Sequence, residues 1–155
     1  MTDEEFISDV EQYRNMVFRL AYSNTGDISC CDDIVQEVFM RYLKCPKSFP
    51  DEESKKFWLI RVTINMCRDH TRRLRCSRGT VLDENASGTD DGGLDEKIAL
   101  RDALKKLPPR YRDVIFLHYY EGYSAAQIGA VLKLSTSGVT SRLQRAREML
   151  KKYLE

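Results

Sequence analysis

The sequence predicts an all-α protein made of two small helical domains joined by a flexible acidic linker. Apolar side chains recur at helical spacing in both halves of the chain, and no stretch has the alternating pattern of paired strands. Between the halves, residues 77–96 are rich in Gly, Asp, Ser and Thr and hold few large apolar side chains, so they cannot bury enough surface to fold alone. The predicted segments are therefore a domain at 1–76, a linker at 77–96 and a domain at 97–155.

Charge is distributed unevenly between these segments. Residues 1–76 carry 12 Lys and Arg against 13 Asp and Glu, a net charge of −1, and residues 77–96 carry 1 against 6, a net charge of −5. Residues 97–155 carry 12 against 5, a net charge of +7. The second domain is thus the part suited to bind a polyanion.

Composition also argues against several classes of protein. No apolar run approaches the roughly 18 residues of a membrane span, and the acidic start MTDEEFISDVEQ is unlike a secretory signal, so we expect a cytoplasmic protein without membrane insertion. Five cysteines without paired CxxC spacing indicate free thiols in a reducing compartment. Cys67, His70 and Cys76 form a metal-like grouping, but they are too few for a zinc site, so we expect no metal or cofactor.

The chain has no recognisable catalytic pattern. It contains two histidines, His70 and His118, without an obvious nucleophile or carboxylate cluster, and no glycine loop that would cradle a phosphate. We expect that it is not an enzyme.

The first domain is expected to hold three helices. Apolar spacing over residues 13–21 indicates the first helix, and NTGD at residues 24–27 breaks it. Asp32 and Asp33 suit the first turn of the second helix, because carboxylates complement the helix dipole there, and a broad apolar stripe follows over residues 34–43.

A loop at residues 44–56 is expected between the second and third helices. Pro46 and Pro50 end the second helix and bracket this loop, and the third helix runs from Phe57 to a basic end that contains Arg72, Arg73 and Arg75.

The second domain is expected to begin with two helices that lead into a helix-turn-helix. The first, at residues 96–107, is stopped by Pro108 and Pro109, and the next ends at Gly122. Ser124 and Ser135 are plausible N-caps of two further helices, and only KLS lies between them to form a turn. A short turn before a long basic helix is the helix-turn-helix pattern, in which the second helix enters the DNA major groove.

A helical wheel of the last helix separates its buried and outward faces. At about 100° per residue, the core seam consists of Val139, Leu143, Ala146 and Leu150. The candidates for base contacts are Ser137, Thr140, Ser141, Gln144 and Arg145. Arg142 and Arg147 lie nearer the seam and could reach flanking phosphates. The alternative is that the basic residues are only a solvated face, and the preceding turn and the +7 charge favour DNA.

Four motifs, in family order, resemble those of the extracytoplasmic-function (ECF) sigma factors of bacterial RNA polymerase. GDISCCDDIVQEVFMRYLK at residues 26–44 resembles the family's acidic D-x-x-Q-E-x-F helix, and FWLIRVTINMCRDHTRR at 57–73 resembles its W-L-x-R-h-x-x-N-x-x-x-D-x-x-R helix. LKKLPPRYRDVIFLHYYEGYS at 104–124 resembles the L-x-x-L-P-x-x-x-R segment, and VTSRLQRAR at 139–147 resembles the recognition helix V-K-S-R-L-x-R-A-R. The resemblance covers nearly the whole chain.

The resemblance implies an initiation factor that binds promoter DNA and RNA polymerase core. The contacts with the core would be the β′ clamp coiled coil and the β flap. An anti-sigma factor would regulate it. The residues implied to dock on the clamp are Asp33, Gln36, Glu37 and Phe39. The loop at 46–56 and the helix at 58–73 would recognise and melt the −10 element, with the candidate residues Phe49, Trp58, Arg61, Asn65, Arg72 and Arg73. The last helix would read the −35 element, with the candidate residues Ser137, Thr140, Ser141, Arg142, Gln144, Arg145 and Arg147.

Some positions depart from the family pattern. Lys133 replaces the usual turn glycine, so the turn forms without the residue best suited to positive φ. Thr140 replaces the usual lysine, which suggests an altered −35 preference. Gly129 and Gly138 each lower helix propensity by about 1 kcal/mol relative to Ala.

The alternative hypothesis is a stand-alone helix-turn-helix regulator that acts without entering the polymerase. Such a regulator has no need for the acidic docking surface between Asp33 and Phe39, so the first domain distinguishes the two hypotheses.

Overall fold

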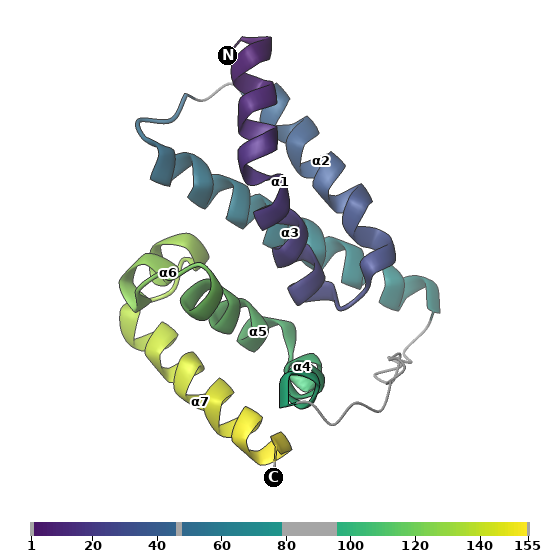
Figure 1. Ribbon diagram of the computed structural model, residues 1–155, viewed down its shortest axis with the longest axis vertical. Coiled ribbons are helices and arrows are strands. Elements are labelled where there is room, and N and C mark those ends of the chain that lie inside the picture. The colour runs from purple at the N-terminus through teal and green to yellow at the C-terminus, as the bar shows by residue number, and fades with distance from the viewer. Residues whose placement is uncertain (1, 46–47, 79–95, 155) are drawn as a thin grey trace. The chain divides into compact units, whose positions relative to one another are not determined.

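The computed structural model of the chain describes residues 2–45, 48–78 and 96–154 (Figure 1). All the elements in this described part are helices, which confirms the predicted all-α class. The chain divides into two compact units, Met1–His70 and Thr71–Glu155. The predicted linker lies largely outside the described residues, because residues 79–95 are not among them. None of the helices in the described ranges combines the length and apolar content that a membrane crossing requires.

Three long helices and one short turn form the first unit. They are α1 (Asp3–Thr25), the 3-10 helix η1 (Ile28–Cys30), α2 (Cys31–Lys44) and α3 (Glu52–Arg78), whose last residues extend past the unit's boundary. Figure 1 shows α1 and α2 side by side, with α3 crossing them. Their apolar faces meet in a core that includes Val17, Leu20, Val38, Leu59, Ile60 and Ile64.

The corner between α1 and α2 forms where the sequence predicted a break. Gly26 ends α1 with φ 70°, the left-handed conformation that glycine adopts without a steric penalty, and its N–H donates to the carbonyl of Tyr22. Asp27 then caps η1, because its carboxylate accepts a hydrogen bond from the backbone N–H of Ser29 at 3.0 Å. The chain thereby reverses within a few residues and starts α2.

The predicted start of α3 was wrong by five residues. The helix begins at Glu52 rather than Phe57, so residues 52–56 are helical and the loop is shorter than expected. The Asp51 carboxylate accepts a hydrogen bond from the N–H of Ser54 at 2.8 Å and caps the helix. Carboxylates at Glu52 and Glu53 then complement the dipole in the first turn.

Five helical elements form the second unit. They are α4 (Glu96–Lys106), α5 (Pro109–Ile115), the π-helical turn η2 (Phe116–Tyr120), α6 (Ala125–Leu132) and α7 (Thr136–Leu154). The long helix α7 packs against α4, α5 and α6. As predicted, Val139, Leu143 and Ala146 are buried along its inner face, while Leu150 is only half-buried.

The helix-turn-helix is formed by α6, a three-residue turn and α7, with both predicted serine caps in place. Ser124 and Gln127 form a reciprocal capping box at the start of α6. Ser135 Oγ accepts a hydrogen bond from the N–H of Gly138 at 3.0 Å at the start of α7. Lys133 forms the turn with φ 60° and ψ 46°, so a side chain is held in the left-handed conformation that normally favours glycine.

Gly129 has a steric role that its low helix propensity does not reveal. A Cβ atom at this position would lie 2.5 Å from the carbonyl oxygen of Leu134, because the turn passes directly over the helix. The backbone also closes here through a 2.9 Å hydrogen bond from the N–H of Leu134 to the carbonyl of Gly129. At Gly138, by contrast, the nearest atom to an added Cβ is the side-chain oxygen of Ser135 at 3.0 Å.

We predict that Gly129→Ala lowers the free energy of unfolding of the second unit by about 2 kcal/mol, because the added methyl group meets rigid backbone. Circular dichroism during thermal unfolding measures this change. Gly138→Ala is the matched control, since its methyl group meets only the side-chain oxygen of Ser135 and the gain in helix propensity offsets a weaker Ser135 cap. Equal stability of the two variants would refute the steric role of Gly129.

Candidate functional site

The outward surface of α2 combines polar and apolar side chains. Asp33, Gln36 and Glu37 are exposed there, as expected for docking residues. Met40 and Leu43 follow on the same side and are 44% and 48% exposed, although sequence analysis placed Leu43 in the buried stripe. We call these five residues the α2 face. It offers a partner helix both hydrogen-bonding groups and apolar contact area.

Phe39 does not belong to the α2 face. Its side chain is 5% exposed and packs edge-on against Tyr42, with ring centroids 6.5 Å apart. The sequence motif grouped Phe39 with the docking residues, but helical geometry turns it inward while Gln36 and Met40 point to the surface. Phe39 therefore packs beneath the α2 face and offers a partner almost no exposed surface.

Glu37 has an intrahelical partner. Its carboxylate lies 3.7 Å from the guanidinium of Arg41, one turn along α2, and both side chains are more than half exposed. Ion pairs of this kind contribute little in water, so the carboxylate can exchange Arg41 for a basic residue of another protein at small cost.

An aromatic cluster lies between α2, α3 and the loop that joins them. The Tyr42 ring is its centre, with centroids 5.9 Å from Trp58, 6.3 Å from Phe49 and 6.1 Å from Phe6. Phe49 and Trp58 also contact each other at 5.9 Å, and both are half-buried. The two aromatic residues expected at the −10 element therefore share one surface, where each retains some exposed ring.

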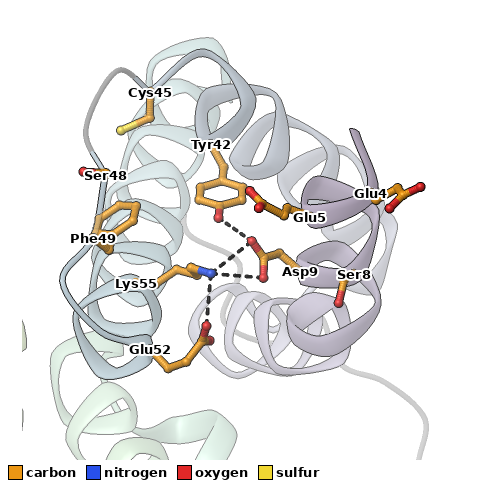
Figure 2. A pocket seen from close by; sticks show the side chains of 10 residues that line it. All are labelled: Glu4, Glu5, Ser8, Asp9, Tyr42, Cys45, Ser48, Phe49, Glu52 and Lys55. Atoms are coloured by element: carbon orange, nitrogen blue, oxygen red, sulfur yellow. Dashed lines mark hydrogen bonds and ion pairs between the residues drawn. The ribbon is translucent and has the colours of Figure 1, made fainter. Parts of the chain in front are cut away.

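A buried carboxylate, Asp9, connects the three helices beneath this cluster (Figure 2). Asp9 is 7% exposed and accepts a hydrogen bond from the Tyr42 hydroxyl of α2. The Lys55 ammonium of α3 lies 3.2 Å from each of its oxygens and 3.2 Å from Glu52, which also accepts a hydrogen bond from Tyr13. Sequence analysis missed this network, because its members are distributed over three helices and form no short motif.

The electrostatics of the network favour a charged lysine and a neutral tyrosine. Burial raises the pKa of the Tyr42 hydroxyl to about 12, and its hydrogen bond to Asp9 adds to the rise. Burial alone would lower the pKa of Lys55, but its hydrogen bonds to Asp9 and Glu52 outweigh burial and raise it. Tyr42 therefore contributes stability that is present below pH 10, its ordinary pKa, and is lost as the pH rises toward 12.

A pocket of about 700 Å³ opens beside the network, as Figure 2 shows. The residues that line it are Glu4, Glu5, Ser8, Asp9, Tyr42, Cys45, Ser48, Phe49, Glu52 and Lys55. Ser48 and Phe49 come from the loop before α3, and Glu4 and Glu5 come from the first turn of α1. The pocket combines an aromatic ring with carboxylate acceptors, which is suitable for a flat polar ring that carries amino groups.

The remaining −10 candidates lie along α3. Arg61 is half-buried, and Asn65, Arg72 and Arg73 are exposed. Arg61 and Asn65 are one turn apart on the same side of the helix. This side of α3 therefore presents hydrogen-bond donors close to the surface.

Helix α7 presents the predicted −35 residues. Those that are exposed are Ser137, Thr140, Ser141, Gln144, Arg145 and Arg147, and Arg142 is half-buried. The Thr140 hydroxyl donates to the carbonyl of Thr136 at 3.0 Å, so its proton is already used within the helix.

Arg147 is held by a residue that the sequence did not suggest. Its Nε donates a 2.6 Å hydrogen bond to the Tyr119 hydroxyl, and its guanidinium lies 5.6 Å from the centroid of the Tyr119 ring. This contact holds Arg147 beside η2, whereas Arg145 is exposed in the middle of α7.

Comparison with family models gives two matches. Residues 10–76 match the model described as Sigma-70 region 2, and residues 97–150 match the model described as Sigma-70, region 4. The first match covers α2, most of α3 and the aromatic cluster except Phe6, and the second covers the helix-turn-helix.

Individual proteins give the same result. The chain is 29% identical to the ECF RNA polymerase sigma factor SigW of Bacillus subtilis (strain 168), over 98% of this chain and 90% of SigW. It is 31% identical to the ECF RNA polymerase sigma factor SigL of Mycobacterium tuberculosis (strain ATCC 25618 / H37Rv), over 94% of this chain and 86% of SigL. The fold is similar to that of the sigma factor RpoE from Bartonella quintana, solved with the anti-sigma factor NepR, with a TM-score of 0.77, 22% identity and coverage of 97% of both chains.

We predict that Lys55→Ala lowers the free energy of unfolding of the first unit by about 3 kcal/mol, because it leaves the buried Asp9 carboxylate without its cation. Trp58 is the single tryptophan of the chain and lies in this unit, so its fluorescence during denaturation reports the first unit alone.

Lys44→Ala, at the exposed end of α2, is the control and should change stability by less than about 1 kcal/mol. In the Asp9→Asn background, Lys55→Ala should have a much smaller effect, since the charge it leaves unpaired is gone. The same loss of stability in both backgrounds would show that Lys55 acts through packing and not through Asp9.

Proposed function

The chain belongs to the extracytoplasmic-function (ECF) family of RNA polymerase sigma factors, and we propose that its two units divide promoter recognition between them. It directs RNA polymerase to promoters, and one observation carries this conclusion: a single chain holds region 2 and then region 4. A stand-alone helix-turn-helix regulator gives region 2 no role, so that alternative is set aside.

In this proposal, residues 1–76 act as sigma domain two, residues 97–155 act as sigma domain four, and residues 77–96 connect them. The region 2 match that ends at residue 76 and the region 4 match that begins at 97 support these boundaries. Helix α3 continues to Arg78, so the proposed end of domain two falls within its last turn.

The α2 face is the proposed docking surface for the clamp coiled coil of the polymerase β′ subunit. Gln36 and Glu37 would bind basic residues of the partner helices, and Asp33 would extend this polar contact. Met40 and Leu43 replace Phe39 in the proposal, because they are exposed and Phe39 is not. Apolar contact beside charge-assisted hydrogen bonds is the composition of a specific protein interface.

The pocket beside Phe49 is the proposed receptor for an unpaired base of the −10 element. Stacking on Phe49 or Trp58 would contribute about 1–3 kcal/mol per base. The carboxylates that line the pocket can accept hydrogen bonds from exocyclic amino groups and repel phosphate, so they favour entry of the base and leave the backbone outside. Arg61, Asn65, Arg72 and Arg73 would then follow the strand along α3.

Helix α7 is the proposed reader of the −35 element. Arg145 is the main candidate for contact with a base edge. The other candidates for base contacts lie around it and are Ser137, Thr140, Ser141 and Gln144. Arg142 and Arg147 are the candidates for contact with flanking phosphates. Thr140 has no hydroxyl proton to offer, because Thr136 accepts it. Its methyl group could contact thymine, which a lysine at this position would not do.

The proposal extends to regulation and place of action. Domain four would also bind the β flap, and an anti-sigma factor would compete with the polymerase, as family members pair with proteins of that class. A factor that initiates transcription at promoters would act in the cytoplasm. It would act by binding, as a non-enzymatic factor.

We predict that the double variant Gln36→Lys with Glu37→Lys loses binding to core polymerase, because it reverses the charge at the centre of the α2 face. Co-purification with core polymerase and transcription in vitro measure the loss. Both side chains are exposed, so circular dichroism should stay unchanged.

The matched control is Glu11→Lys with Gln12→Lys, the same pair of residue types on exposed positions of α1. It makes the same change in charge and should keep polymerase binding. If both double variants retained binding, or both lost it, the α2 face would not be the specific docking surface.

We predict that Arg145→Ala in the holoenzyme weakens binding to a promoter with a matched −35 element about tenfold or more, because a base contact contributes roughly 1–3 kcal/mol of discrimination. Binding to a scrambled −35 element should change little. Fluorescence anisotropy with labelled promoters measures both affinities.

Lys151→Ala is the contrasting variant and should weaken binding to both promoters equally, with a salt slope smaller by about one. Equal losses on matched and scrambled promoters for Arg145→Ala would identify Arg145 as a phosphate contact.

A further inference from the structure

We propose that Asp27, Cys30 and His70 form a binding site for a divalent transition-metal ion, with Zn²⁺ the best fit. Each residue offers one ligand atom, a carboxylate oxygen, the thiol sulfur and a ring nitrogen, and these three atoms all lie within 4.8 Å of one another. The site lies within the first unit, where the corner between α1 and α2 meets α3. The inference is independent of how the chain binds polymerase or DNA.

The corner holds the carboxylate of Asp27 in a defined orientation. One of its oxygens accepts hydrogen bonds from the backbone N–H of Ser29 at 3.0 Å and from the Ser29 hydroxyl at 2.7 Å. Hydrogen bonds from a neighbouring residue to a ligating carboxylate are a regular feature of metal sites, because they fix the ligand before the ion arrives. Asp27 is exposed, so an ion can reach its carboxylate from solvent.

The thiol of Cys30 is buried beside this carboxylate. Its side chain is 7% exposed, and its sulfur lies 3.2 Å from the backbone carbonyl of Asp27 and 3.6 Å from the hydroxyl of Thr25. A thiol is a weak hydrogen-bond donor, so these contacts are easily replaced by a metal–sulfur bond. When that bond forms, the thiol proton is released to solvent.

His70 supplies the third ligand from α3. The imidazole is half-buried, and its Nε2 atom is shielded from solvent without a hydrogen-bond partner among the described residues. A buried ring nitrogen without a partner loses the hydrogen bond it would make to water. A metal ion bound through Nε2 would offset that loss.

The combination of sulfur, nitrogen and carboxylate oxygen selects the kind of metal. Zn²⁺ binds thiolate, imidazole and carboxylate at about 2.0–2.3 Å in tetrahedral geometry, which separates ligand atoms by roughly 3.5 Å. The three ligand atoms now lie within 4.8 Å of one another, so binding would draw them closer together. Mg²⁺ and Ca²⁺ prefer sites made only of oxygen atoms and are poor fits.

Three protein ligands leave a fourth tetrahedral position for water or for a group of another molecule. The bound ion would connect the start of α2 to α3 and so stabilise the first unit, by an amount that grows with the logarithm of metal concentration above Kd. Sequence analysis considered Cys67, His70 and Cys76 together, but Cys76 is exposed and the structure groups His70 with Cys30 and Asp27 instead.

The test is titration of the purified, reduced full-length chain with Zn²⁺ in competition with a chromophoric chelator, and separately with Co²⁺ by absorption spectroscopy. We expect one Zn²⁺ per chain, no competition from Mg²⁺, and a Co²⁺ complex with a thiolate charge-transfer band. His70→Gln and Asp27→Asn should weaken Zn²⁺ binding more than about tenfold, and Cys30→Ser should also remove the charge-transfer band.

Two cysteine variants distinguish this site from others on the chain. Cys76→Ser and Cys67→Ser should bind Zn²⁺ as the unchanged chain does, and loss of binding in either would overturn the assignment in favour of the grouping along α3. Unchanged affinity in His70→Gln, or absence of stoichiometric binding by the unchanged chain, would also overturn it. Trp58 fluorescence confirms that each variant is folded, so that weakened binding reports a lost ligand.

Discussion

The first unit depends on the interactions of the buried Asp9 carboxylate. It accepts hydrogen bonds from Tyr42 of α2 and Lys55 of α3, so one residue of α1 fixes the positions of both other helices. A carboxylate in an apolar interior is unfavourable unless it is paired and hydrogen-bonded, and here both conditions are met. Register between the three helices follows, because a shift of one helical turn would leave this charge without its partners.

The surfaces of the first unit follow from that arrangement. With Tyr42 oriented toward Asp9, its ring supports Phe49 and Trp58, and the loop before α3 lies over the pocket. The inward positions of Phe39 and Tyr42 turn the α2 face toward solvent. The buried charge pair therefore fixes the surfaces proposed to bind polymerase and unpaired DNA.

The second unit depends on a steric constraint instead of a charge. The turn between α6 and α7 passes so close to Gly129 that a side chain there would collide with backbone, and Lys133 accepts an unfavourable conformation to keep the turn short. The short turn therefore limits how α6 and α7 can be oriented relative to each other. The polar side of α7 is then fixed on the surface by the burial of Val139, Leu143 and Ala146.

The sequence by itself determined the helical class, the breaks near Gly26 and Pro108, the serine caps and the buried side of α7, because these follow from local spacing and backbone preferences. Asp51 and the acidic residues after it are also compatible with the start of a helix, but the prolines and lysines nearby favoured the prediction of a loop. Only the tertiary structure decided that Phe39 is buried, that Gly129 is sterically required, and that Asp9 meets Lys55 and Cys30 meets His70. The Asp9 and Cys30 contacts join residues far apart in the chain, and the Gly129 contact arises where the turn folds back over α6, so periodicity within one helix encodes none of them.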